Sequence, residues 1–133
     1  MKKINVVTSF LEHDNKILIL RRSEKVRTMK HQWAGISGYI ESNETPLERA
    51  LKEIEEEVGL KREDVELVQA AEPLEVPDNE RDILWIVHPH IFKTSNANIR
   101  LDWEHDEYRW IDPEEIADYD TVLMLKETLL RCL

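Results

Sequence analysis

Cysteine is almost absent from the chain. Cys132 is the only one in 133 residues, which excludes an internal disulfide and is typical of proteins kept in a reducing compartment. Long hydrophobic runs are absent too: none approaches the roughly 20 residues that span a membrane, and Thr8 and Ser9 interrupt the segment after the basic start at residues 1–3. We therefore expect a cytoplasmic protein that does not cross a membrane.

Positive charge is scarce. Lysine and arginine number 18 against 28 aspartates and glutamates, so the formal net charge is -10 at pH 7. Because basic side chains supply most of the affinity for duplex DNA or RNA, this balance argues against general duplex binding, whereas a small anionic substrate can still bind through metal ions. Hydrophobic content of 41% and charged content of 35% suit one globular domain over residues 1–133, and no repeat is present.

The segment from 38 to 60 contains the densest acidic charge and a predicted helix. Thr45, Pro46 and Glu48 form a capping-box pattern that predicts the helix start, and Gly59 is placed to end the helix in a left-handed conformation. Apolar residues recur at helical spacing and predict a face that packs on the rest of the protein. They are Leu47, Ala50, Leu51, Ile54 and Val58.

On the opposite face, Glu53, Glu56 and Glu57 are three and four residues apart, so their carboxylates point toward one patch. Like charges at this spacing repel, unless a divalent cation binds between them. Ligands that offer only oxygen favour magnesium, manganese or calcium, and open positions on one helix favour magnesium that holds a phosphate-bearing substrate. The alternative interpretation is a solvated helix face.

The spacing of the segment decides between these interpretations. Gly38, Glu44, Glu53, Ile54, Glu56, Glu57, Gly59 and Leu60 stand at the positions of the pattern G-x5-E-x7-R-E-U-x-E-E-x-G-U, where U is aliphatic. This pattern is the Nudix box, and residues 38–60 resemble it. Lys52 stands in place of the box arginine and lacks the planar fork that holds a carboxylate in two bonds. Upstream, where many members have W-x-x-P-G-G, residues 33–38 keep the tryptophan and the last glycine.

The resemblance to MutT-like Nudix hydrolases covers nearly the whole chain and implies an α/β fold, an α/β/α sandwich with a mixed sheet flanked by helices. It also implies hydrolysis of a diphosphate linkage in a nucleoside di- or triphosphate derivative, by water attack at phosphorus and with Mg2+, for which Mn2+ can substitute. The expected partner is a small nucleotide. The sequence predicts neither the substrate nor the oligomeric state.

Site residues follow from the same resemblance. Glu56 and Glu57 are the first choices as metal ligands, joined by the Gly38 carbonyl and by Glu104 in the loop before the last strand. Glu53 either accepts a proton from the attacking water or binds a further metal, because members of the family differ in which glutamate is the base. Two residues, Glu44 and Lys52, are expected to hold this constellation in place. Three other acidic residues compete with Glu104 for its role: Asp102, Asp106 and Glu107.

Residues 21–31 form a locally basic loop that is interpreted equally well as a solvated connection or as a phosphate clamp. Arg22 and Arg27 are the preferred phosphate contacts. Trp33 is a candidate substrate contact, although core packing explains it better. His88 and His90 flank a proline and are expected at the surface or against substrate, not as metal ligands.

Sequence patterns predict the remaining elements. A hairpin is predicted from residues 4–12 and 17–22. Two more strands are predicted at 65–76 and 82–92, with a loop between them at 77–80. Pro89 predicts a bulge or an edge position near the end of the second of these strands. A final strand ends at residue 111, a short helix follows 112, and a last helix covers 121–133.

Two other functions were considered. A Nudix-fold sensor would bind a nucleotide without cleaving it, which Lys52 and the altered loop before the box would allow. Isoprenoid diphosphate isomerases use an active-site cysteine, and Cys132 lies in the wrong region for that role.

Overall fold

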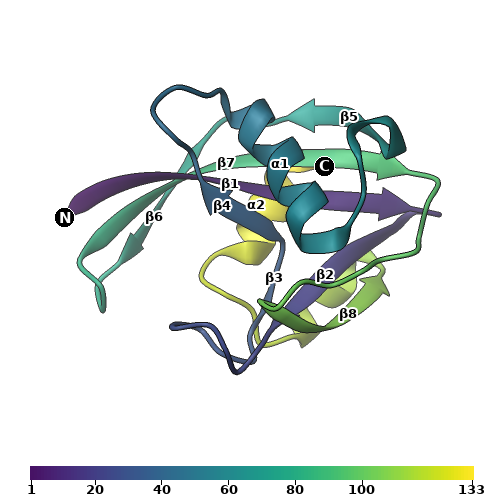
Figure 1. Ribbon diagram of the computed structural model, residues 1–133. Helices are drawn as coiled ribbons and strands as arrows, with labels where there is room; N and C mark the ends of the chain where they lie inside the picture. Colours follow the sequence, from purple (N-terminus) through teal and green to yellow (C-terminus); the bar gives the residue numbers. More distant parts are fainter.

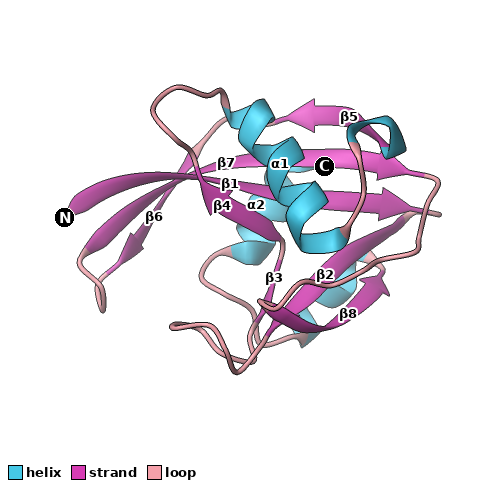
Figure 2. Ribbon diagram, viewed as in Figure 1, coloured by secondary structure: helices cyan, strands magenta, loops and turns pink.

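A mixed eight-stranded sheet lies between two helices in the computed structural model, which describes residues 1–133 (Figures 1 and 2). The strands are β1 (Lys2–His13), β2 (Lys16–Arg22), β3 (Trp33–Ala34), β4 (Ile36–Tyr39), β5 (Val65–Ala70), β6 (Leu74–Asp78), β7 (Ile83–Thr94) and β8 (His105–Ile111). The helices are α1 (Pro46–Val58) and α2 (Leu125–Cys132), with short 3-10 helices at Arg62–Asp64 and Pro113–Asp118.

The centre of the sheet is the pair β1 and β7, which run parallel from the pairing of Lys2 with Ile83 to that of Glu12 with Lys93. Every other strand pair is antiparallel. Strand β4 pairs with β1, β8 pairs with β2, and β5 and β6 pair successively with β7. The sheet is therefore mixed, as expected.

Both faces of the sheet are covered, and two core clusters result. Leu18 and Leu20 of β2 point to the α1 side, where Ile54 packs, whereas Ile17 and Ile19 point to the α2 side. This alternation follows from the two-residue period of a strand, which requires an apolar residue at every position when both faces are buried. In Figure 1, α1 lies in front of the sheet and α2 behind it. The predicted α/β/α sandwich is confirmed.

Local signals in the sequence fix several of these elements. Asp14 and Asn15, with φ of 51° and 66°, make the two-residue turn that joins β1 to β2. In α1, the Thr45 hydroxyl accepts from the Glu48 N–H, and the Glu48 carboxylate accepts from the Thr45 N–H. Gly59 ends the helix at φ 77°. The predicted hairpin and box helix are confirmed.

The region from 65 to 80 was predicted wrongly. The expected single strand at 65–76 is two strands, β5 and β6, and Pro77 and Asp78 belong to β6 and not to a loop. Pro89 lies inside β7, opposite the gap between β5 and β6, where its carbonyl accepts from the Ala71 N–H at 2.9 Å. The proline is tolerated because the neighbouring strand is interrupted at the one position where its missing N–H would be needed.

Two further expectations need correction. His90 is not a surface residue: it is 3% exposed, and its ring stacks on Phe92. The last helix starts at Leu125 and not at residue 121, because Thr121 bridges to Trp33 and the Val122 N–H donates to the Trp33 carbonyl at 2.9 Å. Residues 121–122 thus continue the sheet before the chain turns into α2. No helix is both long and apolar enough to span a membrane.

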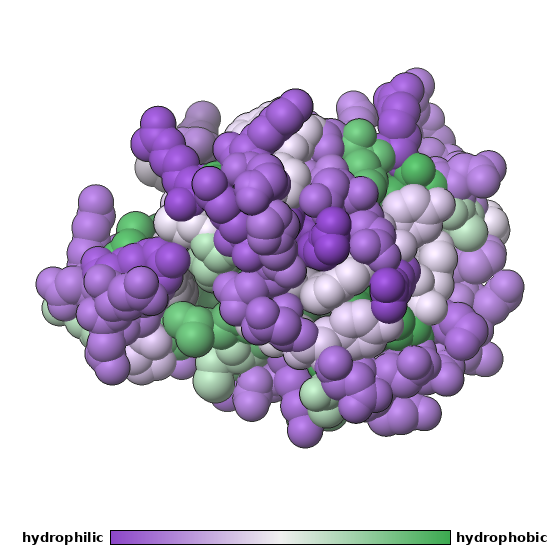
Figure 3. Space-filling view, turned by 90° about the horizontal axis from the view of Figure 1, so that it is seen from below, coloured by the Kyte–Doolittle hydropathy of each residue, from purple (hydrophilic) through white to green (hydrophobic).

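The α2 side of the sheet has an outer end that α2 leaves open. A small apolar cluster lies there, formed by Leu74, Val76 and Val87 with Val6 and Trp85 packed against it. Seen from below in Figure 3, hydrophobic side chains are exposed between hydrophilic ones. Leu74, Val76 and Val87 are themselves buried, whereas Val6 and Trp85 are partly exposed. All of the cluster except Leu74 lines the cleft described below.

Cys132 is expected to be inert toward thiol reagents in the native protein. Its side chain is 4% exposed in the α2 core, and burial raises its pKa to about 11, so roughly 0.1% is thiolate at pH 8. Ellman's reagent should therefore not react at pH 8 until denaturant unfolds the chain. Rapid labelling of the folded protein would contradict the packing of α2.

Candidate active site

Strand β4 and helix α1 approach each other closely at Gly38 and Glu53, two residues of the box. A Cβ on Gly38 would lie 2.4 Å from Cδ of Glu53, well inside the contact limit. The Glu53 carboxylate therefore occupies space that any other residue at position 38 would fill. A side chain at position 38 would therefore displace the Glu53 carboxylate from this position.

An arginine that the sequence analysis did not single out holds two of the box glutamates. Arg49 donates from Nε and Nη2 to the two oxygens of Glu44, at 2.5 Å and 3.2 Å, and from Nη1 to Oε2 of Glu53 at 2.9 Å. Lys52 adds one bond to Glu44 at 3.1 Å. Hydrogen bonds from Arg49 lower the pKa of Glu44 to about 2. The planar fork missing at position 52 is thus supplied one helical turn earlier.

Glu57 is the most unusual carboxylate of the site. Its side chain is 2% exposed, and Oε2 has no hydrogen-bond partner in the protein. Burial first, and then the neighbouring Glu53 carboxylate, raise the pKa of Glu57 well above its ordinary value. A buried carboxylate without a partner is costly unless a cation binds it.

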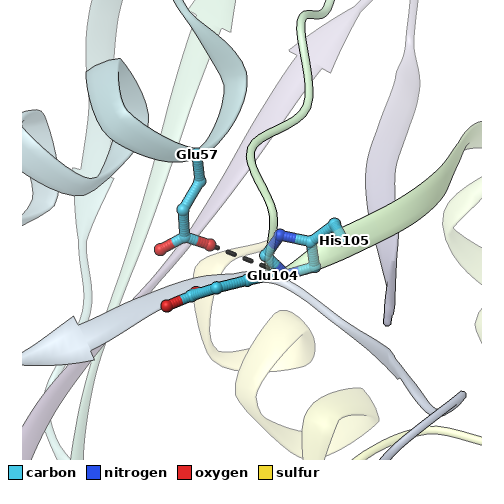
Figure 4. Close-up of side chains that lie close together, drawn as sticks. All are labelled: Glu57, Glu104 and His105. Atoms are coloured by element: carbon cyan, nitrogen blue, oxygen red, sulfur yellow. Dashed lines mark ion pairs between the residues drawn. The ribbon is translucent and has the colours of Figure 1, made fainter. Parts of the chain in front are cut away.

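The start of β8 brings a second group of side chains toward Glu57 (Figure 4). The pairing of β2 with β8 has a bulge here: Arg21 pairs with Glu107, but Arg22 pairs with His105. Ser23 fastens the preceding segment, because its N–H donates to the Glu104 carbonyl at 2.8 Å. Bulges redirect side chains, and this one places Glu104 and His105 beside α1.

Together these side chains can hold a divalent cation. Ligand atoms of Glu57, Glu104 and His105 all lie within 4.8 Å of one another. Burial and the neighbouring Asp102 raise the pKa of Glu104, and burial lowers the pKa of His105. The fit to a metal ion rests on the unpartnered Oε2 of Glu57 and on the oxygen-rich donor set, both of which a hard cation would satisfy.

The metal-ligand candidates open into a cleft of about 640 Å³ on the α2 side of the sheet. Five candidates from the sequence line it together: Gly38, Glu53, Glu56, Glu57 and Glu104. The rivals of Glu104 have other partners, since Asp102 accepts from His105 and both Asp106 and Glu107 pair with Arg21. A second hollow of similar size, beside the β1–β2 turn, is lined by 11 residues of which one is hydrophobic, so it offers little apolar contact to a ligand.

Basic side chains line the same cleft. Arg22 is half-buried, donates from Nε to the Thr28 carbonyl at 3.1 Å, and has its pKa lowered by burial against the opposing pull of Glu104. Arg27 also lines the cleft. Trp33 does not: it is 8% exposed, packs edge-on against Tyr119 in the α2 core, and is corrected to a core residue.

An aromatic pair forms the far wall. The rings of Tyr39 and Trp85 lie nearly parallel, with centroids 6.2 Å apart and an interplanar angle of 16°. Asp78, which is 2% exposed, accepts from Trp85 Nε1 at 3.1 Å and from Arg81 at 2.9 Å, so the indole is fixed in place. Tyr39 directly follows Gly38, which puts a flat exposed surface next to the carboxylates.

Sequence reasoning missed Arg49 and His105 as members of the site. The signal for Arg49 was present, because it lies four residues before Glu53 and therefore on the same helix face. The position of His105 depends on the β2–β8 bulge, for which the sequence gives no marker.

Comparison with known proteins agrees with this fold. The family model described as NUDIX domain matches residues 1–131. Bis(5'-nucleosyl)-tetraphosphatase [asymmetrical] of Mus musculus is 28% identical over 118 residues, covering 86% of this chain and 76% of that protein. Nucleoside triphosphatase NudI of Escherichia coli O139:H28 is 24% identical over 136 residues, covering 97% and 96%.

The fold is also matched by solved structures. An Ap4A hydrolase binary complex from C. elegans superposes with a TM-score of 0.80 at 17% identity, covering 96% of this chain and 93% of that one. The family match over nearly the whole length confirms the assignment made from the box. The chain belongs to the NUDIX domain family and is a Nudix-type hydrolase.

Proposed function

We propose that the chain hydrolyses a diphosphate linkage in a nucleoside di- or triphosphate derivative, with Mg2+ held by Glu56, Glu57, Glu104 and the Gly38 carbonyl, and with Mn2+ able to replace it. The observation that carries the proposal is the buried Glu57 carboxylate, whose unpartnered oxygen lies among other carboxylates at the wall of a cleft. Such a group is stable in its charged form only with a cation bound.

Each residue of the cleft has a role in this reaction. A bound divalent ion supplies charge neutralisation on the phosphate oxygens and a more acidic water. Glu57 would hold that ion in a water-poor position, while Glu53, which Arg49 fixes, would accept the proton of the attacking water. Arg22 and Arg27 line the same cleft and would bring positive charge to the phosphates. Glu44 and Lys52 act by positioning Arg49 and through it Glu53.

A nucleotide suits the cleft because it is polar at one end and flat at the other. The relatives named above act, by their names, on a dinucleoside tetraphosphate and on nucleoside triphosphates, which share a nucleoside joined to a chain of phosphates. The Tyr39 and Trp85 rings offer a surface on which a base can stack, next to the carboxylates that would bind the phosphates. We therefore place the base on the aromatic wall and the phosphates at the carboxylates.

The test is product analysis by chromatography with Mg2+, over nucleoside triphosphates, dinucleoside polyphosphates, sugar nucleotides, ADP-ribose and oxidised guanine nucleotides. Reaction in water labelled with 18O shows which phosphorus is attacked. We expect one class to release a nucleoside mono- or diphosphate, with label in one product and no release by Glu57→Gln. Tight nucleotide binding without turnover, with Mg2+ and again with Mn2+, would instead support the sensor function.

Tyr39→Ala is expected to raise KM for a nucleotide substrate about ten-fold with little change in kcat, because base stacking on an aromatic ring contributes about 1–3 kcal/mol. Tyr108→Ala is the matched control, since Tyr108 is also exposed but lies outside the cleft. Steady-state kinetics of both variants test whether Tyr39 contacts the substrate. Equal KM values in the two variants would remove Tyr39 from the substrate site.

A further inference from the structure

His105 is a buried imidazole at the edge of a carboxylate site. Its side chain is 2% exposed and lies between two acidic residues. Nδ1 is 3.2 Å from Oδ1 of Asp102, and Nε2 is 3.7 Å from Oε1 of Glu57. The ring is therefore bonded on one side and open on the other.

Asp102 determines which nitrogen is open. A carboxylate accepts a hydrogen bond from Nδ1–H, which leaves the lone pair on Nε2, and this is the arrangement by which proteins orient a metal-binding histidine. The 3.7 Å from Nε2 to Glu57 is too long for a hydrogen bond. Asp102 is in turn fixed to its own loop, because it accepts from the Glu104 N–H at 3.3 Å. The lone pair of Nε2 thus faces the carboxylates in a fixed direction.

The donor atoms lie near the spacing that one ion requires, so that small side-chain shifts would bring them to a single ion. In an octahedral site with bonds of about 2.1 Å, adjacent ligand atoms lie about 3.0 Å apart and opposite ones about 4.2 Å apart. Nε2 of His105 and Oε1 of Glu57, 3.7 Å apart, lie between these values, and the whole group with Glu104 lies within 4.8 Å. An independent observation is that Oε2 of Glu57 is buried without a hydrogen-bond partner in the protein, which suits a cation ligand.

We propose that His105 Nε2 is a ligand of the divalent metal, so that the centre contains one nitrogen donor among oxygens and binds Mn2+ and other transition ions more tightly, relative to Mg2+, than a centre built from oxygen alone. Magnesium prefers oxygen donors and gains little from an imidazole, whereas the affinity of first-row transition ions for a site with a nitrogen donor rises from Mn2+ through Fe2+ to Co2+. The inference rests on the metal centre of the proposed function but not on hydrolysis. Asp102 is the residue that positions the ring.

The direct test is pulsed EPR of Mn2+ bound to the wild-type protein, compared with protein labelled with 15N-histidine. A directly coordinated imidazole gives a nitrogen modulation that changes with the isotope. We expect this modulation in the wild type, its loss in His105→Phe, and its retention in His90→Phe. His90 is the matched control because it is equally buried but lies outside the cleft.

Titration calorimetry with Mn2+ and with Mg2+ supplies a second readout. We expect His105→Phe to weaken Mn2+ binding by at least about ten-fold and Mg2+ binding by less. Mn2+ bound to the wild type without any nitrogen modulation would overturn the assignment of His105 while leaving the oxygen site intact. Failure of the wild type to bind either ion would overturn this inference and also the metal centre of the proposed function.

Discussion

Glu57→Gln is expected to lower turnover by at least about 10³-fold and, in the absence of metal, to make the fold more stable. Activity is lost because the amide removes the negative charge that holds the cation. Stability rises because the wild type keeps a carboxylate that is 2% exposed and has an unpartnered oxygen, at a cost of about 1–3 kcal/mol that a neutral amide reduces. Opposite effects on the two properties distinguish a functional carboxylate from a structural one.

The gain in stability depends on pH in a defined direction. Because burial raises the folded-state pKa of Glu57 above its unfolded value, folding favours the protonated form. The wild type is therefore relatively most stable below the unfolded pKa, near 4.5, and loses stability as pH rises toward the folded pKa. Thermal unfolding in EDTA should show a larger difference between Glu57→Gln and wild type at pH 8 than at pH 5.

Metal provides the control for this experiment. Adding Mg2+ or Mn2+ should raise the Tm of the wild type and leave that of Glu57→Gln nearly unchanged, because only the native wild-type site binds the ion. The role given to Glu57 would be refuted if the variant kept wild-type turnover. It would also be refuted if the Tm difference between variant and wild type in EDTA were the same at pH 5 and pH 8.

Arg49→Ala is expected to lower turnover about 10- to 100-fold, the usual effect of removing a residue that orients a metal-site ligand. The guanidinium alone connects Glu44, whose side chain is 3% exposed, to Glu53. Arg49→Lys keeps the charge but not the fork, so it should also lose activity. Lys52→Ala removes one bond to Glu44 and should cost less.

A rescue experiment tests whether the position of the fork matters. Adding Lys52→Arg to Arg49→Lys restores an arginine at the box position, and we expect activity to recover in the double variant. Because the pKa of Glu44 is lowered from 4.5 to about 2, its stabilising contribution is fully present above the unfolded value and is lost progressively as pH falls from there to about 2. Full activity of Arg49→Ala would show that Lys52 suffices.

The parts of the fold predicted correctly depend on neighbours in sequence. The capping box at Thr45 and the two-residue turn at Asp14 and Asn15 bond within a few residues, so their patterns are complete in the sequence. The Nudix box belongs to the same class, because Glu53, Glu56 and Glu57 share one helix. These elements needed no knowledge of the sheet.

The errors involve contacts between distant segments. Pro89 was expected at an edge or a bulge, whereas it lies in a central strand whose neighbour is interrupted at that point. His105 joins the site because a bulge shifts β8 against β2, and Trp33 leaves it because residues 120–122 pair with its backbone. Each outcome depends on strand register, which is determined by tertiary packing.

The parallel pairing of β1 with β7 has a consequence for how the site forms. It joins the first residues of the chain to a strand that begins at Ile83, and β8, which carries His105, follows only after that strand. Closing so long a loop delays folding, and the carboxylates of α1 meet Glu104 and His105 only when the sheet is assembled. A metal ion therefore cannot guide the early collapse of the chain. Its effect should be kinetic and late: it slows escape from the native state and leaves the speed of reaching that state unchanged.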